Sequence, residues 1–189
     1  MSPILVAAEE VCRFLDECGW VYAIIGGVAV MARGEPRTTS DVDVALAVAL
    51  GEEPAVVEKL LERFNARFSD ARKLASESRM VLVEASNGVP LDISLACFPF
   101  EEAMLRRATR CSLGTDNILT ILSSEDLIVH KALAGRDRDW ADIQGIFDVH
   151  GAEIAFADVC QRLTEIADLI EYETVVHKLT EIRRQALNS

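Results

Sequence analysis

The chain has 189 residues, of which 50% are hydrophobic and 26% are charged, a composition that fits one domain with or without a helical appendage and excludes a mostly disordered chain. The 19 basic residues against 31 acidic ones give a charge of −12, which excludes extended nucleic-acid binding but permits a small basic pocket for one nucleotide or one RNA end. The longest nearly unbroken apolar stretch, residues 20–32, is shorter than the ~18 residues of a membrane-spanning helix, so we expect no membrane partner.

The N-terminus and the cysteines suggest where the protein works. The first residues, MSPILVAAEE, have no basic start, so we expect no signal peptide. Buried free thiols in a reducing compartment explain the odd number of scattered cysteines, and we expect a cytoplasmic protein. These cysteines are Cys12, Cys18, Cys97, Cys111 and Cys160.

The first part of the chain mixes helical and strand patterns. Apolar residues at helical spacing predict a helix over residues 4–18, and a buried strand over 21–25 then stops at Gly26 and Gly27. The following predicted elements are a helix at 28–32, a strand at 41–48, a helix at 54–68, strands at 80–85 and 91–96, a helix at 101–109 and a strand at 118–122. Asn87 and Gly88 between two of these strands are typical of a hairpin.

The last part of the chain has only helical patterns. Ser123 with Asp126 three residues later predicts an N-cap for a helix that ends near residue 134. Further helices are predicted over 137–150, 154–170 and 173–187. We therefore predict an α+β fold with a core over residues 1–122, followed by a helical C-terminal region over 123–189 that packs on or beside the core.

Three aspartates in the predicted core are candidates for metal binding. Asp41 and Asp43 are two residues apart at the start of a predicted strand, so their carboxylates point the same way. Asp92 is an acidic residue in an otherwise apolar strand. Carboxylates this close are costly unless they face water or share a cation, and Mg²⁺ prefers such oxygen ligands. Alternatively, Asp41 and Asp43 are solvated residues at a strand end.

The order of the motifs favours a nucleotide as the ligand. A buried strand runs into Gly26 and Gly27, and a short helix, a loop with Arg37 and then the aspartates follow. Paired glycines let backbone N–H groups approach a phosphate at a helix N-terminus, where the helix dipole favours anions. A tight turn that requires positive φ is the alternative explanation of the glycines.

Three ordered segments resemble the nucleotidyltransferase superfamily, which has the DNA-polymerase-β-like fold. They are IIGGVAVMARGEPRTTSDVDVAL (24–46), VPLDISLA (89–96) and SSEDLIVHKALAGRDRDWADI (123–143). The last segment is similar to the AbiEii-toxin-like branch of minimal nucleotidyltransferases. The resemblance covers about residues 20–145 and implies a mixed sheet flanked by helices.

The resemblance also implies roles for the motif residues. Asp41, Asp43 and Asp92 would bind Mg²⁺ or Mn²⁺, and Asp92 would help to activate the attacking hydroxyl. Gly26 and Gly27 would hold the nucleotide phosphates, although many superfamily members have Gly-Ser at this place. The hydroxyl that a serine would supply is missing from this chain.

Further candidates follow from the same resemblance. Lys131 and Asp139 match later motifs of the branch as catalytic candidates, with Lys131 touching phosphate. The candidates for nucleotide binding outside the glycine pair are Arg37, Thr38, Ser40 and Arg136. Alternatively, Lys131 faces solvent on an amphipathic helix, and residues 136–142 form a surface ion-pair face in which Arg138 pairs with Asp142.

The activity implied is the transfer of a nucleoside monophosphate from a nucleoside triphosphate (NTP) to a hydroxyl acceptor. The acceptor would be a small molecule, a protein side chain or a tRNA end. In such an in-line displacement, metal ions neutralise charge on the attacking and leaving oxygens. Toxin-like members imply an antitoxin partner, and the helical tail would otherwise carry a homodimer interface. The alternative function is a module that binds a nucleotide or a partner without turnover.

Overall fold

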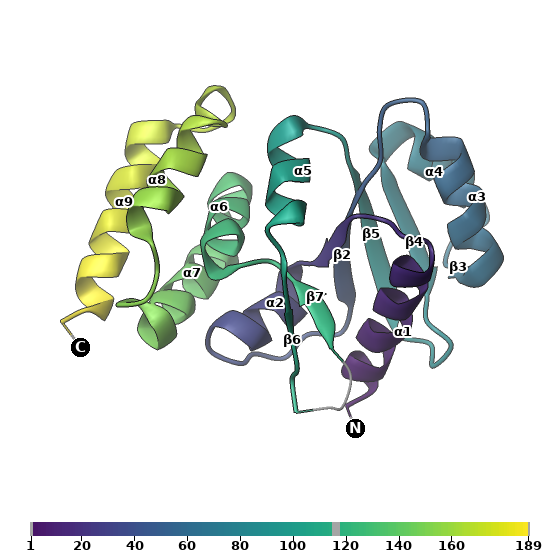
Figure 1. The fold of residues 1–189 in the computed structure, drawn as a ribbon, viewed down its shortest axis with the longest axis horizontal. Coiled ribbons are helices and arrows are strands. Elements are labelled where there is room, and N and C mark those ends of the chain that lie inside the picture. The colour runs from purple at the N-terminus through teal and green to yellow at the C-terminus, as the bar shows by residue number, and fades with distance from the viewer. Residues whose placement is uncertain (1, 115–117, 189) are drawn as a thin grey trace. The chain divides into compact units, whose positions relative to one another are not determined.

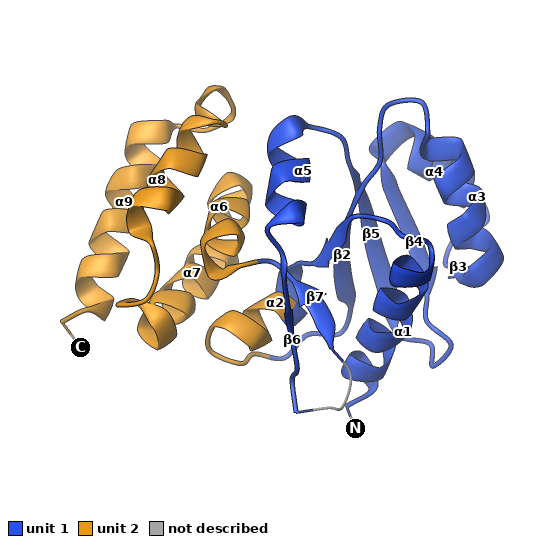
Figure 2. Ribbon diagram, in the orientation of Figure 1, with its two compact units in different colours: residues 1–28, 38–122 blue, residues 29–37, 123–189 orange. Residues whose placement is uncertain are grey.

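The computed structural model describes residues 2–114 and 118–188. It divides into two compact units (Figures 1 and 2). Unit 1 consists of Met1–Val28 and Thr38–Leu122, and unit 2 consists of Ala29–Arg37 and Ser123–Ser189. The segment Ala29–Arg37 therefore groups with the C-terminal helices, whereas the division into domains at residue 122 stays a prediction.

Unit 1 is built around a mixed sheet of seven strands, counted over the described residues, in the order β3-β4-β5-β2-β1-β7-β6. The strands are β1 Tyr22–Ile24, β2 Val42–Ala47, β3 Asn65–Ala66, β4 Met80–Glu84, β5 Pro90–Ala96, β6 Thr109–Cys111 and β7 Leu119–Ile121. β2 runs parallel to β5 and β1 runs parallel to β7, while the other neighbours are antiparallel. The predicted α+β fold with a mixed sheet is confirmed.

The two strands that carry the aspartates lie side by side inside the sheet. Residues alternate between the two faces of a strand, and alternate residues of β2 and β5 are fully buried. These buried residues are Val42, Val44, Leu91 and Ile93. Asp43 and Asp92 therefore project from the opposite face, where both are half-buried.

Helices flank the sheet of unit 1. They are α1 Pro3–Glu17, α3 Glu53–Arg63, α4 Ala71–Ser78 and α5 Pro99–Arg106. α1 packs against β2 and β7, and α5 packs against β1 and β2. The turn predicted at Asn87 and Gly88 joins β4 to β5, and Gly88 has the positive φ of +78° that a hairpin loop of this kind requires.

The helix predicted over 54–68 is wrong in its second part. α3 ends at Arg63, and Phe64 takes an extended conformation with φ −122° and ψ 148°. The ring of Phe64 is buried and meets the ring of Phe14 edge to face at a centroid distance of 5.4 Å. Tertiary packing thus overrides the helical spacing, and the chain continues into β3 and α4, which the sequence pattern did not predict.

Unit 2 is helical. Its helices are α6 Ser124–Ala134, α7 Asp137–His150, α8 Phe156–Thr164 and α9 Tyr172–Ala186, and the short 3₁₀ turn Ala167–Leu169 stands where the predicted helix 154–170 was to continue. The Ser123 hydroxyl accepts a hydrogen bond from the Asp126 backbone N–H at 3.1 Å, so the predicted N-cap is confirmed. Helix α2, Gly26–Arg33, is divided between the units after Val28.

The helices and the cysteines bear on two further expectations. Within 2–114 and 118–188, every helix is too short or too polar to cross a membrane. The five cysteines are free as expected, but only Cys12 is buried and the other four are half-buried.

Candidate active site

Three carboxylates meet on one face of the sheet in unit 1. Asp43 in β2 is the register partner of Asp92 in β5, so the two residues are neighbours across a parallel strand pair. Asp41 lies two residues before Asp43, in the loop that leads into β2. One oxygen atom of each carboxylate lies within 4.8 Å of the others, and all three residues are half-buried. The structure therefore brings together the three predicted metal ligands.

Gly26 makes room for one of these carboxylates. Its φ is +60°, and a Cβ atom built on it would lie 1.8 Å from Oδ2 and 2.5 Å from Cγ of Asp43. Any side chain here would both strain the backbone and displace the aspartate. The positive φ expected for a tight turn is present, and the expected contact of Gly26 with phosphate stays a prediction.

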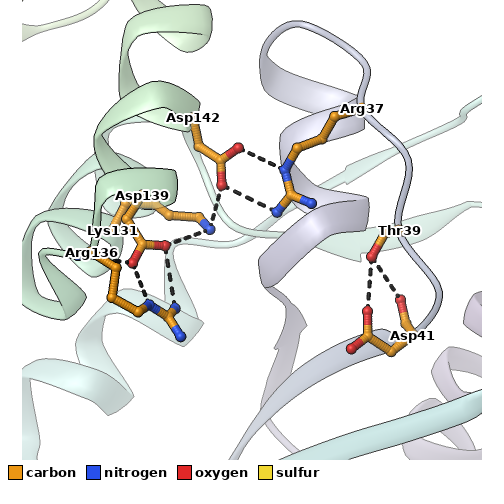
Figure 3. Close-up of polar contacts among 7 residues, drawn as sticks. All are labelled: Arg37, Thr39, Asp41, Lys131, Arg136, Asp139 and Asp142. Atoms are coloured by element: carbon orange, nitrogen blue, oxygen red, sulfur yellow. Dashed lines mark hydrogen bonds and ion pairs between the residues drawn. The ribbon is translucent and has the colours of Figure 1, made fainter.

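Gly27 makes room for Thr39. A Cβ atom on Gly27 would lie 2.4 Å from Oγ1 and 2.6 Å from Cβ of Thr39. The Thr39 hydroxyl lies 2.8 Å from Oδ1 of Asp41. Figure 3 draws this contact. Gly27 thus leaves space for the Thr39 side chain, which in turn contacts the Asp41 carboxylate of the site.

A protein cation also reaches the site. The guanidinium of Arg67, which follows β3, donates a hydrogen bond to Oδ1 of Asp92, and both side chains are about one quarter exposed, at 26% and 27%. β3 pairs with β4 and β4 pairs with β5, and this order brings Arg67 to Asp92 from 25 residues away in sequence. Arg67 therefore brings a positive charge to the group of three carboxylates.

The donor set fits a divalent cation. Ligands of an octahedral Mg²⁺ ion lie about 3.0 Å apart when adjacent and about 4.2 Å apart when opposite, so oxygens within 4.8 Å of one another would move closer together to bind one ion. At this separation each pair of carboxylates repels by about 1–3 kcal/mol, depending on solvent screening. Asp41, Asp43 and Asp92 would hold Mg²⁺ or Mn²⁺, and oxygen ligands suit both ions.

Unit 2 contains a second group of aspartates, which has its own cations. Lys131 Nζ lies 3.0 Å from Oδ1 of Asp139 and 2.7 Å from Oδ2 of Asp142. Arg37 Nε pairs with Asp142 at 2.7 Å, and Arg136 Nε pairs with Asp139 at 2.6 Å. These five residues form an alternating sequence of charges that we call the charge chain (Figure 3).

The centre of the charge chain is buried. Lys131 is 3% exposed, Asp139 0% and Asp142 4%. Burial by itself raises the pKa of the Asp139 carboxyl, but hydrogen bonds from Arg136 and Lys131 outweigh burial and lower this pKa to about 2. The Asp139 carboxylate at the centre of the charge chain is therefore ionised at neutral pH.

Two alternatives from the sequence are wrong. Lys131 is not solvent-facing, and Asp139 and Asp142 do not belong to a surface ion-pair face. α7 packs against α6 so that these aspartates, three residues apart, face Lys131 from the neighbouring helix. Asp142 finds its arginine 105 residues away at Arg37. The expected contact between Lys131 and phosphate stays a prediction.

The other nucleotide-binding candidates lie in different surroundings. Arg37 and Arg136 belong to the charge chain. Thr38 and Ser40 are exposed in the loop before β2. Their roles in nucleotide binding stay predictions.

Thr39 and Arg67 contact the carboxylates but were not predicted from the sequence. For Thr39 the available pattern was a hydroxyl residue two positions before Asp41, near enough along the chain for a local contact. For Arg67 there was none, because its contact with Asp92 depends on a strand that the sequence pattern did not predict.

Three solved structures are similar to this chain. One is an antigenic nucleotidyltransferase-like protein from Paracoccidioides brasiliensis, with 16% identity and a TM-score of 0.50. The match covers 93% of this chain and 91% of that protein's chain. A lincomycin-bound lincosamide antibiotic adenylyltransferase, LnuA, matches 72% of this chain over 91% of its own (14% identity, TM-score 0.44). The match to the antibiotic-resistance factor ANT(2'')-Ia covers 97% of this chain and 94% of that chain, with 18% identity and a TM-score of 0.47. At 16% identity, the likeness to the Paracoccidioides brasiliensis protein shows a nucleotidyltransferase-like fold alone.

The family is shown by sequence. The model of the family described as "Nucleotidyltransferase of unknown function (DUF6036)" matches residues 5–150, more than half of the chain. The chain therefore belongs to the DUF6036 family of nucleotidyltransferases. Comparison with curated proteins finds no match. The predicted superfamily is confirmed, and the AbiEii-like branch stays a prediction.

Proposed function

We propose that this protein transfers a nucleoside monophosphate from an NTP to a hydroxyl acceptor in a reaction that depends on Mg²⁺ or Mn²⁺. The observation that carries the proposal is the convergence of Asp41, Asp43 and Asp92 within 4.8 Å. The family described as nucleotidyltransferases supports it independently.

Charge explains why such a site suits this reaction. An NTP and an attacking hydroxyl oxygen that becomes anionic repel each other, and three carboxylates alone would make this worse. When bound, divalent metal supplies the positive charge that stabilises the attacking and leaving oxygens of an in-line displacement. The aspartates of the chain therefore act by binding and orienting rather than by covalent chemistry.

Each carboxylate has a distinct setting that suits a distinct part. Asp41 is held by a threonine hydroxyl, and Asp43 lies against the backbone of Gly26. Asp92 lies opposite Asp43 and beside Arg67. We assign to Asp92 the role of accepting the proton from the attacking hydroxyl. We assign to the charge chain the role of stabilising the fold of unit 2, because both carboxylates that Lys131 contacts are buried.

Labelled nucleotide tests the proposal. The full chain is incubated with α-³²P-labelled NTPs, Mg²⁺ and cell extract, and transfer of label to any acceptor is measured with pyrophosphate release. We expect label transfer by the wild type and at least a ~100-fold loss in Asp41→Asn and Asp43→Asn, since each removes a metal ligand. Asp168→Asn, which changes an exposed carboxylate in unit 2, is the matched control and should transfer at the wild-type rate.

The outcomes separate the proposal from its alternative. Equal labelling by the wild type and the two aspartate variants would overturn the assignment of the site. Calorimetric binding of Mg-NTP without pyrophosphate release would favour a module that binds nucleotide without turnover. The paired Arg67 and Asp92 are the feature that this alternative would use, because a protein cation already contacts one of the three carboxylates.

The labelled extract also separates the acceptor classes. Label in small molecules, in protein or in RNA would distinguish the three acceptors expected from the resemblance. The charge of −12 makes an extended nucleic-acid acceptor unfavourable. The antitoxin partner, the homodimer and the cytoplasmic location stay predictions, which co-purification, solution mass and cell fractionation would test.

A further inference from the structure

We propose that Thr39 is a positioning residue of the candidate metal site, which holds the Asp41 carboxylate ready for a divalent cation. The inference rests on the proposed function, which assigns the cation to Asp41, Asp43 and Asp92. It adds a residue outside that set and explains why Gly27 lacks a side chain.

Thr39 faces inward between two exposed hydroxyl residues. Thr38 and Ser40 are exposed, whereas Thr39 is half-buried in the loop before β2. Its hydroxyl lies 2.8 Å from Oδ1 of Asp41 but 3.4 Å from the Asp41 backbone oxygen. The hydroxyl has a single proton, so the shorter contact to the carboxylate is the main hydrogen bond. A turn that served only the backbone would favour the carbonyl oxygen instead.

The Thr39 side chain packs directly against Gly27. A Cβ atom on Gly27 would lie within 3.2 Å of three Thr39 side-chain atoms, Oγ1, Cβ and Cγ2. The positive-φ residues of the described chain include Gly26 but not Gly27, so backbone conformation does not explain this second glycine. Close packing of the Thr39 side chain does explain it, and this packing limits the positions that the hydroxyl can take.

The hydrogen bond leaves Asp41 able to bind a cation. An ionised carboxylate has about four lone-pair sites on its two oxygens, and the Thr39 hydroxyl uses one of them. Fixing the carboxylate before the cation arrives reduces the entropy lost on binding and keeps Asp41 within 4.8 Å of Asp43 and Asp92. Losing a hydrogen-bond partner of a metal ligand typically weakens metal binding by about 10–100-fold.

A pair of substitutions isolates the hydroxyl. Thr39→Val keeps the branched shape and removes the hydroxyl, while Thr39→Ser keeps the hydroxyl and removes a methyl group. Thr180→Val makes the same change at an exposed threonine of α9, whose hydroxyl bonds to the Val176 carbonyl at 2.8 Å. The Mn²⁺ dissociation constant of the full chain is measured by calorimetry or electron paramagnetic resonance, together with the melting temperature.

We expect Thr39→Val to bind Mn²⁺ about 10–100-fold more weakly, with Thr39→Ser within about threefold of the wild type and Thr180→Val unchanged. In the transfer assay, Thr39→Val should need more metal for half-maximal rate and regain most of its rate at saturating metal. A merely structural threonine would lower the melting temperature without this metal-dependent rescue.

Three results overturn the inference. Wild-type Mn²⁺ affinity in Thr39→Val does so, as does equal weakening in Thr39→Ser. If either of these results is obtained while Asp43→Asn loses Mn²⁺ binding, the proposed function survives and only the role of Thr39 fails. If wild type and Asp43→Asn bind Mn²⁺ equally, the assigned metal site and the role of Thr39 fail together.

Discussion

The three aspartates of the sheet and the two aspartates of the charge chain show how one residue type serves opposite purposes. In unit 2, Asp139 and Asp142 are buried and each contacts a lysine and an arginine of the chain itself. In unit 1, Asp41, Asp43 and Asp92 are half-buried and lie close together, and Arg67 pairs with Asp92. Buried carboxylates between basic side chains hold a fold together, whereas half-buried carboxylates that lie close to one another are suited to share a metal ion.

Removing a cation from the charge chain should have the largest effect on stability. Lys131→Met leaves two buried aspartates without their shared ammonium, and we expect the free energy of unfolding to fall by about 3–5 kcal/mol. Denaturant titration measures this, with Lys73→Met, an exposed lysine of α4, expected to stay within about 0.5 kcal/mol of the wild type.

Asp43→Asn completes this comparison, because it keeps the shape of the side chain and relieves repulsion in the sheet, and it should lower the unfolding free energy far less than Lys131→Met does. A loss in Asp43→Asn as large as that in Lys131→Met would erase the distinction between the two groups of aspartates.

Filling the space at Gly26 should cost both stability and metal binding. Gly26→Ala adds a Cβ atom 1.8 Å from Oδ2 of Asp43 at a φ of +60°, and we expect about 2–4 kcal/mol of destabilisation and weaker Mn²⁺ binding. Gly19→Ala is the matched control, because Gly19 has a similar φ of +68° with nothing within 4 Å of an added Cβ. This control should lose only about 1–2 kcal/mol and keep its metal affinity. Equal losses in both variants would show that Asp43 is free to move aside.

The acid dependence of stability should report the charge chain. The pKa of Asp139 is about 2 in the folded protein against an ordinary value of 3.8, so its ionised form stabilises the fold above about pH 4. This contribution, on the order of 2 kcal/mol, is lost as pH falls toward 2. Unfolding titrations at pH 5 and pH 2.5 should therefore show a smaller gap between wild type and Asp139→Asn at the lower pH. A constant gap would contradict the lowered pKa.

Removing the arginine from the carboxylate site should have the smallest effect. Arg67→Met takes away a competing positive charge beside Asp92, and we expect Mn²⁺ to bind about threefold more tightly. Arg72→Met, which breaks an exposed pair with Glu58, should leave Mn²⁺ binding unchanged. Weaker binding in Arg67→Met would mean that Arg67 orients Asp92 instead of competing for it.

The sequence predicted the parts of this molecule that depend on local patterns. The spacing of two in Asp41 and Asp43 and the lone Asp92 in an apolar strand pointed to one shared face, and the parallel pairing of β2 with β5 places them there. The helix cap at Ser123 and the hairpin turn at Gly88 were likewise predicted from short local patterns. These features need only a few neighbouring residues to be recognised.

The features that the sequence did not predict depend on contacts between distant segments. The helix predicted to residue 68 ends at Arg63 because the Phe64 ring packs on Phe14. The burial of Lys131 follows from two aspartates on the next helix, and Arg37 reaches Asp142 across 105 residues. Helical spacing alone could not distinguish this buried arrangement from a solvated ion-pair face.

Anomalous scattering from a crystal grown with Mn²⁺ and a non-hydrolysable NTP would locate the cation itself. We expect a peak about 2.1–2.2 Å from oxygens of Asp41 and Asp43, with Asp92 beside it and the phosphates of the nucleotide on its other side. Nucleotide bound elsewhere, or a manganese peak remote from these three carboxylates, would contradict the assignment of this face of the sheet as the active site.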